Sequence, residues 1–336
     1  MLLSGIALMY ACSKNEGTPA PEDHSVAFVI PSNFPAPAYN FEENKLSKAG
    51  FDLGKKLFYD ARLSADKSVS CGSCHQQFAA FTQLDHKVSH GVNNCQGRRN
   101  TPPLVNLVWQ KAFFWDGGVK NLETAPLNAI TDACEMGTSI EDIISVLKKT
   151  TPYSDLFKKA FGSDEINSQR ILKSITQFTA MLVSGNSRYD QVMRKEAGAT
   201  FTSIEQAGYA LFKEKCMSCH AEPFFTDFSY RSNGLDPVSI DEGRSHITGL
   251  QSDFGTFRVP TLRNIEYTSP YMHDGRFYSL DEVLEHYSSG VKKAPNLDPR
   301  LKDGISLSEL QKEQIKAFLK TLTDHEFIKN TLFSES

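Results

Sequence analysis

The two halves of the chain repeat one ordered set of sequence signals. Each half contains the pattern C-x-x-C-H, as CGSCH at 71–75 and CMSCH at 216–220. Each pattern follows a segment with helical spacing of apolar residues that contains G-x-x-L-F, at 54–58 and 208–212. A second element, P-x-L-x-N followed by D-G and a leucine, recurs at identical internal spacing from Pro102 and from Pro260. The sequence therefore predicts two copies of one domain.

The C-x-x-C-H pattern indicates covalent haem attachment. Its two thiols add across the vinyl groups of a haem and the adjacent imidazole ligates the iron. Zinc is the main alternative, but the two pairs lie far beyond the spacing of zinc ribbons and knuckles. A thioredoxin-like redox pair would need a βαβ setting, which the sequence lacks. We therefore expect two haem c groups, bound by Cys71, Cys74 and His75 and by Cys216, Cys219 and His220.

Strand-like alternation is scarce, so the predicted fold is mainly α, with two cytochrome-c-like helical domains, long loops and one haem in each. An amphipathic helix at 168–184 is expected to close the first unit, and a polar, glycine-containing stretch follows it. The expected boundaries are a leader at 1–23, an N-terminal domain at 24–185, a linker at 186–202 and a C-terminal domain at 203–336.

The N-terminal residues predict export. Residues 2–11 form a short apolar run that fits the h-region of a signal peptide better than a membrane span. The run MYAC at 9–12 resembles a relaxed bacterial lipobox, with Cys12 as the lipid-anchored residue, although no Lys or Arg precedes it. A plain cleaved signal and an apolar end without function are the alternatives. The expected location is the periplasm, where haem attachment of this kind occurs, with or without a lipoprotein anchor.

Charge and the remaining cysteines add two expectations. The net charge is -4 and Lys and Arg are scattered, so the chain shows no basic excess for a nucleic-acid partner. Cys95 and Cys134 lie outside the haem motifs. A disulfide between them and two buried thiols are equally compatible with an oxidising compartment.

Further motifs resemble a known family. From about residue 41 to residue 327 the chain carries RNTP at 99–102, FWDG at 114–117, EM at 135–136, VPTLRN at 259–264 and PYMHDG at 270–275. In this order around two haem motifs, they resemble the bacterial di-haem cytochrome c peroxidases and their relatives that mature methylamine dehydrogenase. The resemblance implies an enzyme that reduces hydrogen peroxide to water with electrons from a small cytochrome c or cupredoxin.

The same resemblance implies roles for two residues between the haem motifs. Glu135 matches the family's distal acid/base, which moves a proton during cleavage of the peroxide bond. Trp115 matches the tryptophan that lies between the two haems. Without the family, Glu135 would be interpreted as a solvated charge and Trp115 as a core aromatic. The family's distal Gln falls on Ala125, so we expect peroxide to be positioned differently.

One departure from the family concerns access to the N-terminal haem. In its gated peroxidases a loop His blocks this haem until the other haem is reduced, and Val92 stands at that position. An open, constitutively active iron is therefore the preferred interpretation. His86 and His90 are nearby alternatives for the gate.

A second departure concerns the distal ligand of the C-terminal haem. The gated peroxidases carry Met there, whereas fourteen residues past His273 this chain has Tyr287, as in the maturation enzymes. A phenolate ligand would lower the reduction potential of the haem. Met272 and His286 are the alternatives.

The family also implies a calcium ion and leaves other functions open. Asn100 and the backbone carbonyls of Thr268 and Pro270 would bind the calcium by motif position. Tyr287 suggests an alternative activity, the oxidation of a protein or small molecule through a di-Fe(IV) state. A non-catalytic di-haem electron-transfer cytochrome is the alternative of another class. The sequence does not identify the electron donor or the oligomeric state, a homodimer included.

Overall fold

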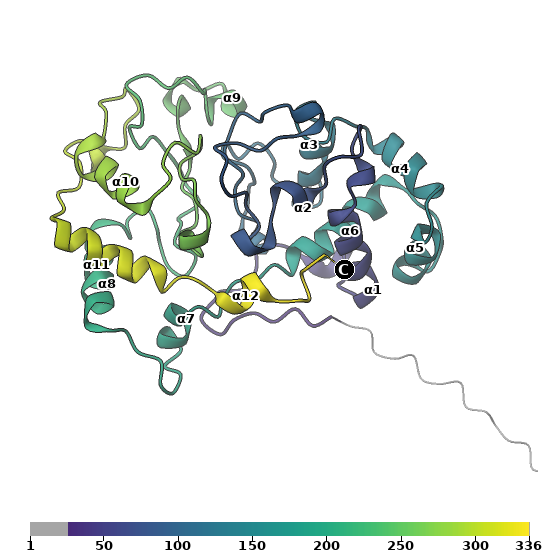
Figure 1. Ribbon diagram of the computed structural model, residues 1–336, viewed down its shortest axis with the longest axis horizontal. Helices are drawn as coiled ribbons and strands as arrows, with labels where there is room; N and C mark the ends of the chain where they lie inside the picture. Colours follow the sequence, from purple (N-terminus) through teal and green to yellow (C-terminus); the bar gives the residue numbers. More distant parts are fainter. Residues whose placement is uncertain (1–25, 336) are drawn as a thin grey trace, which may run out of the picture.

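The computed structural model describes residues 26–335 and has two helical lobes side by side (Figure 1). The expected leader and the anchor at Cys12 lie outside the described residues. The first lobe and the connection that follows it contain α1 (Lys48–Tyr59), α2 (Cys71–Cys74), α3 (Ala125–Thr131), α4 (Ile140–Lys148), α5 (Tyr153–Phe161), α6 (Ser168–Ala180) and α7 (Arg188–Met193). The rest of the chain contains α8 (Ser203–Lys215), β1 (Tyr230–Arg231), α9 (Ser245–Thr248), β2 (Phe257–Arg258), α10 (Leu280–Glu285), α11 (Glu309–Lys320) and α12 (His325–Lys329).

The mainly helical fold class is confirmed. The strands β1 and β2 form one short antiparallel pair, with Tyr230 opposite Arg258 and Arg231 opposite Phe257. Long loops that contain several 3-10 turns connect the helices. Among residues 26–335, no helix is long and apolar enough to cross a membrane.

A pair of crossing helices organises each lobe, and the crossing is built the same way twice. In the first lobe α1 packs on α6, and a Cβ atom at Gly54 would lie 1.9 Å from the carbonyl oxygen of Ser174. In the second lobe α8 packs on α11, and a Cβ atom at Gly208 would lie 1.9 Å from the carbonyl oxygen of Gln314. Only glycine permits this approach, so the repeated G-x-x-L-F segments mark equivalent helix crossings.

The asparagine of each P-x-L-x-N element occupies an equivalent place. Asn106 and Asn264 both adopt the left-handed backbone conformation, with φ of 56° and 60°. The Asn106 side chain accepts from the N–H of Ser184, and the Asn264 side chain accepts from the N–H of Asp324, at 2.9 and 2.8 Å. Each asparagine therefore binds the backbone just after the last long helix of its own copy, α6 in the first and α11 in the second.

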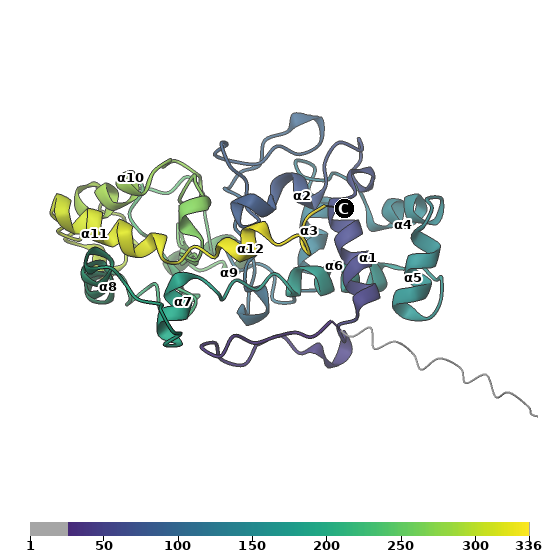
Figure 2. The ribbon, with the colours of Figure 1, turned by 60° about the horizontal axis from the view of Figure 1, so that its bottom comes forward.

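The C-terminal segment returns to the first lobe. Figure 2 shows α12 between the lobes and the chain end beside α1. Phe327, Ile328 and Phe333 belong to a buried aromatic cluster with residues of α1 and α6. The hydroxyl of Tyr59 donates to the carbonyl oxygen of Phe333 at 2.8 Å. The end of the expected C-terminal domain thus contributes to the core of the other lobe.

Candidate haem sites and the path between them

The first C-x-x-C-H motif forms one helical turn, α2, with His75 directly after it. The Nδ1 atom of His75 lies 2.8 Å from the carbonyl oxygen of Phe81. A carbonyl oxygen can only accept, so Nδ1 carries the proton and Nε2 has its lone pair free for a metal. Burial lowers the pKa of His75 to about 4, which keeps the ring neutral. His75 can therefore offer Nε2 to a metal ion.

The second motif repeats this arrangement. The Nδ1 atom of His220 lies 3.0 Å from the carbonyl oxygen of Phe225. Phe81 and Phe225, the two residues whose carbonyl oxygens orient the histidines, both have a positive φ, of 60° and 54°. Burial lowers the pKa of His220 as well. The two copies thus select the same imidazole tautomer with the same backbone turn.

The four motif cysteines fit thioether attachment better than a zinc site. All four are unpaired in the structure and partly buried. Burial raises the pKa of Cys71 and that of Cys216 to about 12, so both are neutral thiols near neutral pH. Within residues 26–335, no group of three or more His, Cys, Asp or Glu side chains is placed to hold a metal ion. The donor set in each lobe, two thiols and one neutral imidazole, is that of haem c.

Glu135 lies near the two thiols of the first haem motif. Its carboxylate is close enough to Cys71 and Cys74 for its charge to raise the pKa of both thiols. Burial, assisted by the charge of Asp132, raises the pKa of Glu135 itself to about 7. A carboxyl group with this pKa can accept and release a proton near neutral pH. The structure therefore brings Glu135 and the first haem motif together.

Two loops meet beside Glu135, and a disulfide links them. Cys95 and Cys134 are bonded, with their Cα atoms 4.9 Å apart, which answers the question that the sequence left open. The N–H of Val92 donates to the carbonyl oxygen of Glu135 at 2.9 Å. A Cβ atom at Gly91 would lie 2.0 Å from the carbonyl oxygen of Cys134, so the loops are in close contact.

The residue at the family's gating position is buried and apolar. Val92 is 3% exposed and packs over Gly137, which lies in the Glu135 loop. The ring of His90 is held by Asn94, with Nδ1 2.6 Å from its side-chain oxygen. His86 is exposed, and its ring centroid lies 5.1 Å from that of His90. Ala125, at the start of α3, contributes an apolar contact at the position where the resemblance leads us to expect Gln.

Tyr287 lies in a π-helical turn, residues His286–Gly290, directly after α10. Burial raises the pKa of its phenol, and Cys219 and Cys216 lie near enough to raise it further. Asn233 contacts all three candidate ligands, because its side chain is also hydrogen-bonded to the phenol of Tyr287. The backbone oxygen of Asn233 contacts Nε2 of His286 at 3.0 Å, and its side chain donates to the sulfur of Met272 at 3.3 Å.

Trp115 lies at the junction of the two lobes. It is 8% exposed, and its indole N–H donates to the carbonyl oxygen of Asn100 at 2.7 Å. Its own carbonyl oxygen accepts from the N–H of Arg258, across the lobe boundary, at 2.7 Å. Its ring meets that of His273 edge to face, with centroids 6.5 Å apart. Trp115 thus contacts both lobes, and its role between the two haems stays a prediction.

Comparison with known proteins agrees with this arrangement. The family model for di-haem cytochrome c peroxidases matches residues 48–198. Methylamine utilization protein MauG of Methylorubrum extorquens is 35% identical to the chain, over 88% of this chain and 83% of MauG. The chain belongs to the di-haem cytochrome c peroxidase family. As a member of this family, it is an oxidoreductase that carries two haem c groups.

Two further comparisons agree with this family, and a third shows the same fold. Cytochrome c551 peroxidase of Nitrosomonas europaea is also 35% identical, over 81% of this chain and 79% of that protein. The crystal structure of a MauG-like protein associated with microbial copper homeostasis superposes with a TM-score of 0.83 at 31% identity, covering 92% of this chain and 99% of that one. The diheme peroxidase BthA from Burkholderia thailandensis shares the fold, with a TM-score of 0.71 at 21% identity, over 87% of this chain and 91% of that one.

The residues expected to bind calcium carry free oxygen atoms. The side-chain nitrogen of Asn100 donates to the carbonyl oxygen of Lys87 at 3.1 Å, which directs its oxygen elsewhere. That oxygen, and the carbonyl oxygens of Thr268 and Pro270, accept no hydrogen bond from the described residues. Neutral oxygen atoms of this kind suit a calcium ion that keeps several waters.

Sequence reasoning missed two residues of the lobe junction, Arg258 and His273. The guanidinium of Arg258 is buried, and its Nε donates to the carbonyl oxygen of Phe114 at 3.2 Å. This burial lowers the pKa of Arg258. Alignment of the two repeats on their D-G pairs would have found both residues, because it places His273 at the position of Trp115 and Arg258 at that of Asn100.

Proposed function

We propose that this family member reduces hydrogen peroxide to water at the N-terminal haem, with electrons from a small periplasmic cytochrome c or cupredoxin. The observation that carries the proposal is the partly buried carboxyl group of Glu135, whose pKa is raised to about 7 beside the first haem motif. Bound haem would supply the iron at which peroxide is held and reduced. The chain would supply the proton transfer and the route for electrons.

Glu135 is the proposed acid/base. Above its pKa the carboxylate takes a proton from the bound peroxide, and the resulting acid returns it to the leaving oxygen. The carboxylate needs a fixed position for both transfers. The Cys95–Cys134 disulfide and the backbone contact of Val92 with Glu135 support such a position. The apolar side chain of Val92 has no atom that could ligate the iron and block the access of peroxide.

The second lobe is the proposed source of electrons. Tyr287 would ligate its iron through the phenolate, an anionic oxygen that stabilises the oxidised metal. Trp115, between the lobes, would carry electrons to the first haem, and its hydrogen bond to Asn100 fixes the indole. A calcium ion held by Asn100, Thr268 and Pro270 would join this junction from both lobes.

A second candidate activity is the oxidation of a protein or small organic molecule with peroxide as the oxidant. Two observations favour it: the placement of Tyr287 with Cys216 and Cys219, and the 35% identity to MauG. A haem with a phenolate ligand would be hard to reduce and comparatively easy to oxidise. The two activities are distinguished by comparing peroxide-dependent turnover with reduced cytochrome c and with organic substrates. Faster turnover of the cytochrome indicates the first activity, and faster turnover of an organic substrate indicates the second.

The experiment that tests the proposal mixes the oxidised holoprotein with peroxide in a stopped-flow instrument, without prior reduction. We expect a rapid change of the Soret band, and a low-temperature EPR spectrum with one high-spin and one low-spin haem. An electron-transfer cytochrome with two six-coordinate irons would show no rapid change. Two low-spin haems, with a reaction with peroxide only after one-electron reduction, would contradict the open site. His90 or His86 would then be the residue that blocks the N-terminal haem.

A further inference from the structure

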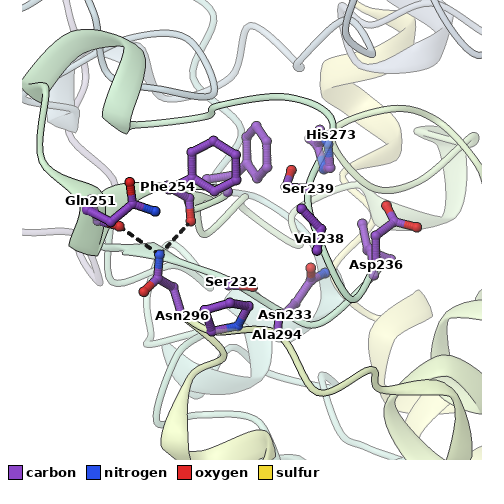
Figure 3. Close-up of a pocket in the computed structure, with 14 residues that line it drawn as sticks. Ser232, Asn233, Asp236, Val238, Ser239, Gln251, Phe254, His273, Ala294 and Asn296 are labelled. Carbon is purple, nitrogen blue, oxygen red and sulfur yellow. Dashed lines mark hydrogen bonds between the residues drawn. The ribbon is translucent and has the colours of Figure 1, made fainter.

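A cavity in the second lobe takes no part in the proposed reaction of peroxide. Its volume is about 140 Å³, and its walls come from residues 232–239, 251–257 and 294–296, together with His273 (Figure 3). An apolar cavity of about 150 Å³ is large enough to hold one benzene molecule. The cavity therefore has room for a single ring.

The walls of this cavity suit a neutral ring with polar substituents. Phe254 and Phe257 provide aromatic surface, and Val238, 68% exposed, lies at the edge. The charge of Asp236 is compensated by Arg276, whose Nη2 lies 2.6 Å from the carboxylate. Because Asp236 is already paired with Arg276, it is not available to bind a positively charged ligand.

Asn296 provides an unused acceptor in the cavity wall. Its side-chain nitrogen donates to the carbonyl oxygens of Gln251 and Phe254, at 2.8 and 3.0 Å, and these contacts fix the amide (Figure 3). Its side-chain oxygen accepts no hydrogen bond from residues 26–335. A hydroxyl group on a bound ring could donate to this oxygen at no cost to the existing contacts.

A row of rings leads from the cavity to the lobe junction. The ring of Phe257 stacks on that of His273, with centroids 3.6 Å apart and an angle of 13° between the planes. His273 in turn meets Trp115 at 6.5 Å between centroids. An aromatic molecule in the cavity would thus be separated from Trp115 by two rings in contact.

We propose that the cavity binds a monocyclic aromatic diol and passes its electrons through Phe257 and His273 to Trp115. This step rests on the proposed reduction of peroxide. The diol loses two electrons, one at a time, and the protons of its two O–H bonds, and it becomes a quinone. Hydrogen peroxide accepts two electrons and two protons, its O–O bond breaks, and two waters form. The cavity is then a second entry for electrons, independent of a protein donor.

Binding is tested with phenol, which has the size of the diol but is much harder to oxidise. Calorimetric titration of the oxidised holoprotein should show one phenol per chain. Ala294→Trp places an indole in the cavity and should weaken binding at least about tenfold, whereas Ala197→Trp, on the exposed loop between α7 and α8, should not change it. Absence of phenol binding to the wild type, or equal binding to Ala294→Trp, would overturn the site.

Electron entry is tested with hydroquinone as the only donor for peroxide reduction. Ala294→Trp should lose about tenfold or more of this turnover and keep its turnover with reduced cytochrome c within about twofold. At saturating hydroquinone, Phe257→Leu should oxidise hydroquinone about tenfold more slowly than the wild type, because it interrupts the row of rings to Trp115. Undiminished hydroquinone oxidation by Ala294→Trp would overturn the proposal. A third outcome separates the two proposals. Phenol could bind to the wild type and not to Ala294→Trp, while neither hydroquinone nor reduced cytochrome c supports peroxide reduction. That result would contradict the peroxidase function and the electron route but confirm the binding site.

Discussion

Trp115 and His273 stand at equivalent positions of the two sequence repeats and meet each other across the lobe boundary, with ring centroids 6.5 Å apart. Their backbones are held by equivalent contacts. The N–H of Asn100 donates to the carbonyl oxygen of His273, and the N–H of Arg258 donates to that of Trp115, both at 2.7 Å. The junction is thus pseudo-symmetric, because a segment of the first repeat pairs with the equivalent segment of the second repeat. The two copies differ in their side chains: an indole faces an imidazole, and Asn100 of one copy corresponds to Arg258 of the other.

Trp115→Phe should slow electron transfer between the haems more than the initial reaction with peroxide. Phenylalanine keeps the bulk but is harder to oxidise and loses the hydrogen bond to Asn100. Stopped-flow spectra separate the two steps. Trp109→Phe is the matched control, because Trp109 is also buried and also donates to a backbone oxygen, that of Pro35, at 2.8 Å. Equal slowing of both steps in Trp115→Phe would make Trp115 a packing residue only.

Glu135→Gln should keep both haems and slow the reaction with peroxide by roughly 10²–10⁴-fold, the scale of a lost acid/base group. The pKa of Glu135 is about 7, so the carboxylate that accepts the proton is lost as the pH falls below that value. The wild-type rate should therefore fall below pH 7, whereas the low rate of Glu135→Gln should not follow this profile. Undiminished turnover of Glu135→Gln would remove the residue from the mechanism.

Asp132→Asn tests the electrostatic part of this assignment. The charge of Asp132 contributes to the raised pKa of Glu135, after burial. Its removal should lower that pKa and move the midpoint of the pH profile to lower pH, with the rate at high pH retained. Asparagine can still accept the hydrogen bond from the N–H of Cys134, which is 2.7 Å in the wild type. An unchanged midpoint would show that another group controls the profile.

Replacement of both Cys95 and Cys134 by Ser should lower the thermal unfolding midpoint of the first lobe. Loss of a native disulfide costs about 2–5 kcal/mol in small domains. A thiol reductant should lower the midpoint of the wild type in the same way and leave the double variant unchanged, because thioether bonds to haem are not reduced. A wild type that is insensitive to the reductant would contradict a stabilising role of this bond.

Tyr287→Met should raise the reduction potential of the C-terminal haem, because a thioether replaces an anionic phenolate. A spectroelectrochemical titration of both haems measures the change, and only one of the two potentials should move. Tyr278→Phe is the control, since Tyr278 is a half-exposed tyrosine of the same lobe. If Tyr287→Met leaves both potentials in place, Met272 or His286 becomes the ligand to replace next.

Local patterns predicted much of this molecule. The haem motifs, the helices before them and the duplicated P-x-L-x-N elements were readable because each depends on residues within a few turns of one another. The expected helix at 168–184 is present as α6 (Ser168–Ala180). Glu135, Trp115 and Tyr287 became candidates only through the family resemblance, because a lone Glu, Trp or Tyr carries no local signal of its own.

By itself, the sequence determined that there are two similar lobes, each with two thiols and an imidazole in one short motif. The tertiary structure alone decided which distant groups meet. It paired Cys95 with Cys134, placed Trp115 against His273 and returned Phe327 and Phe333 to the first lobe. The physical reason is that attachment chemistry is local in the chain, whereas burial and contact between lobes depend on how the two copies pack against each other.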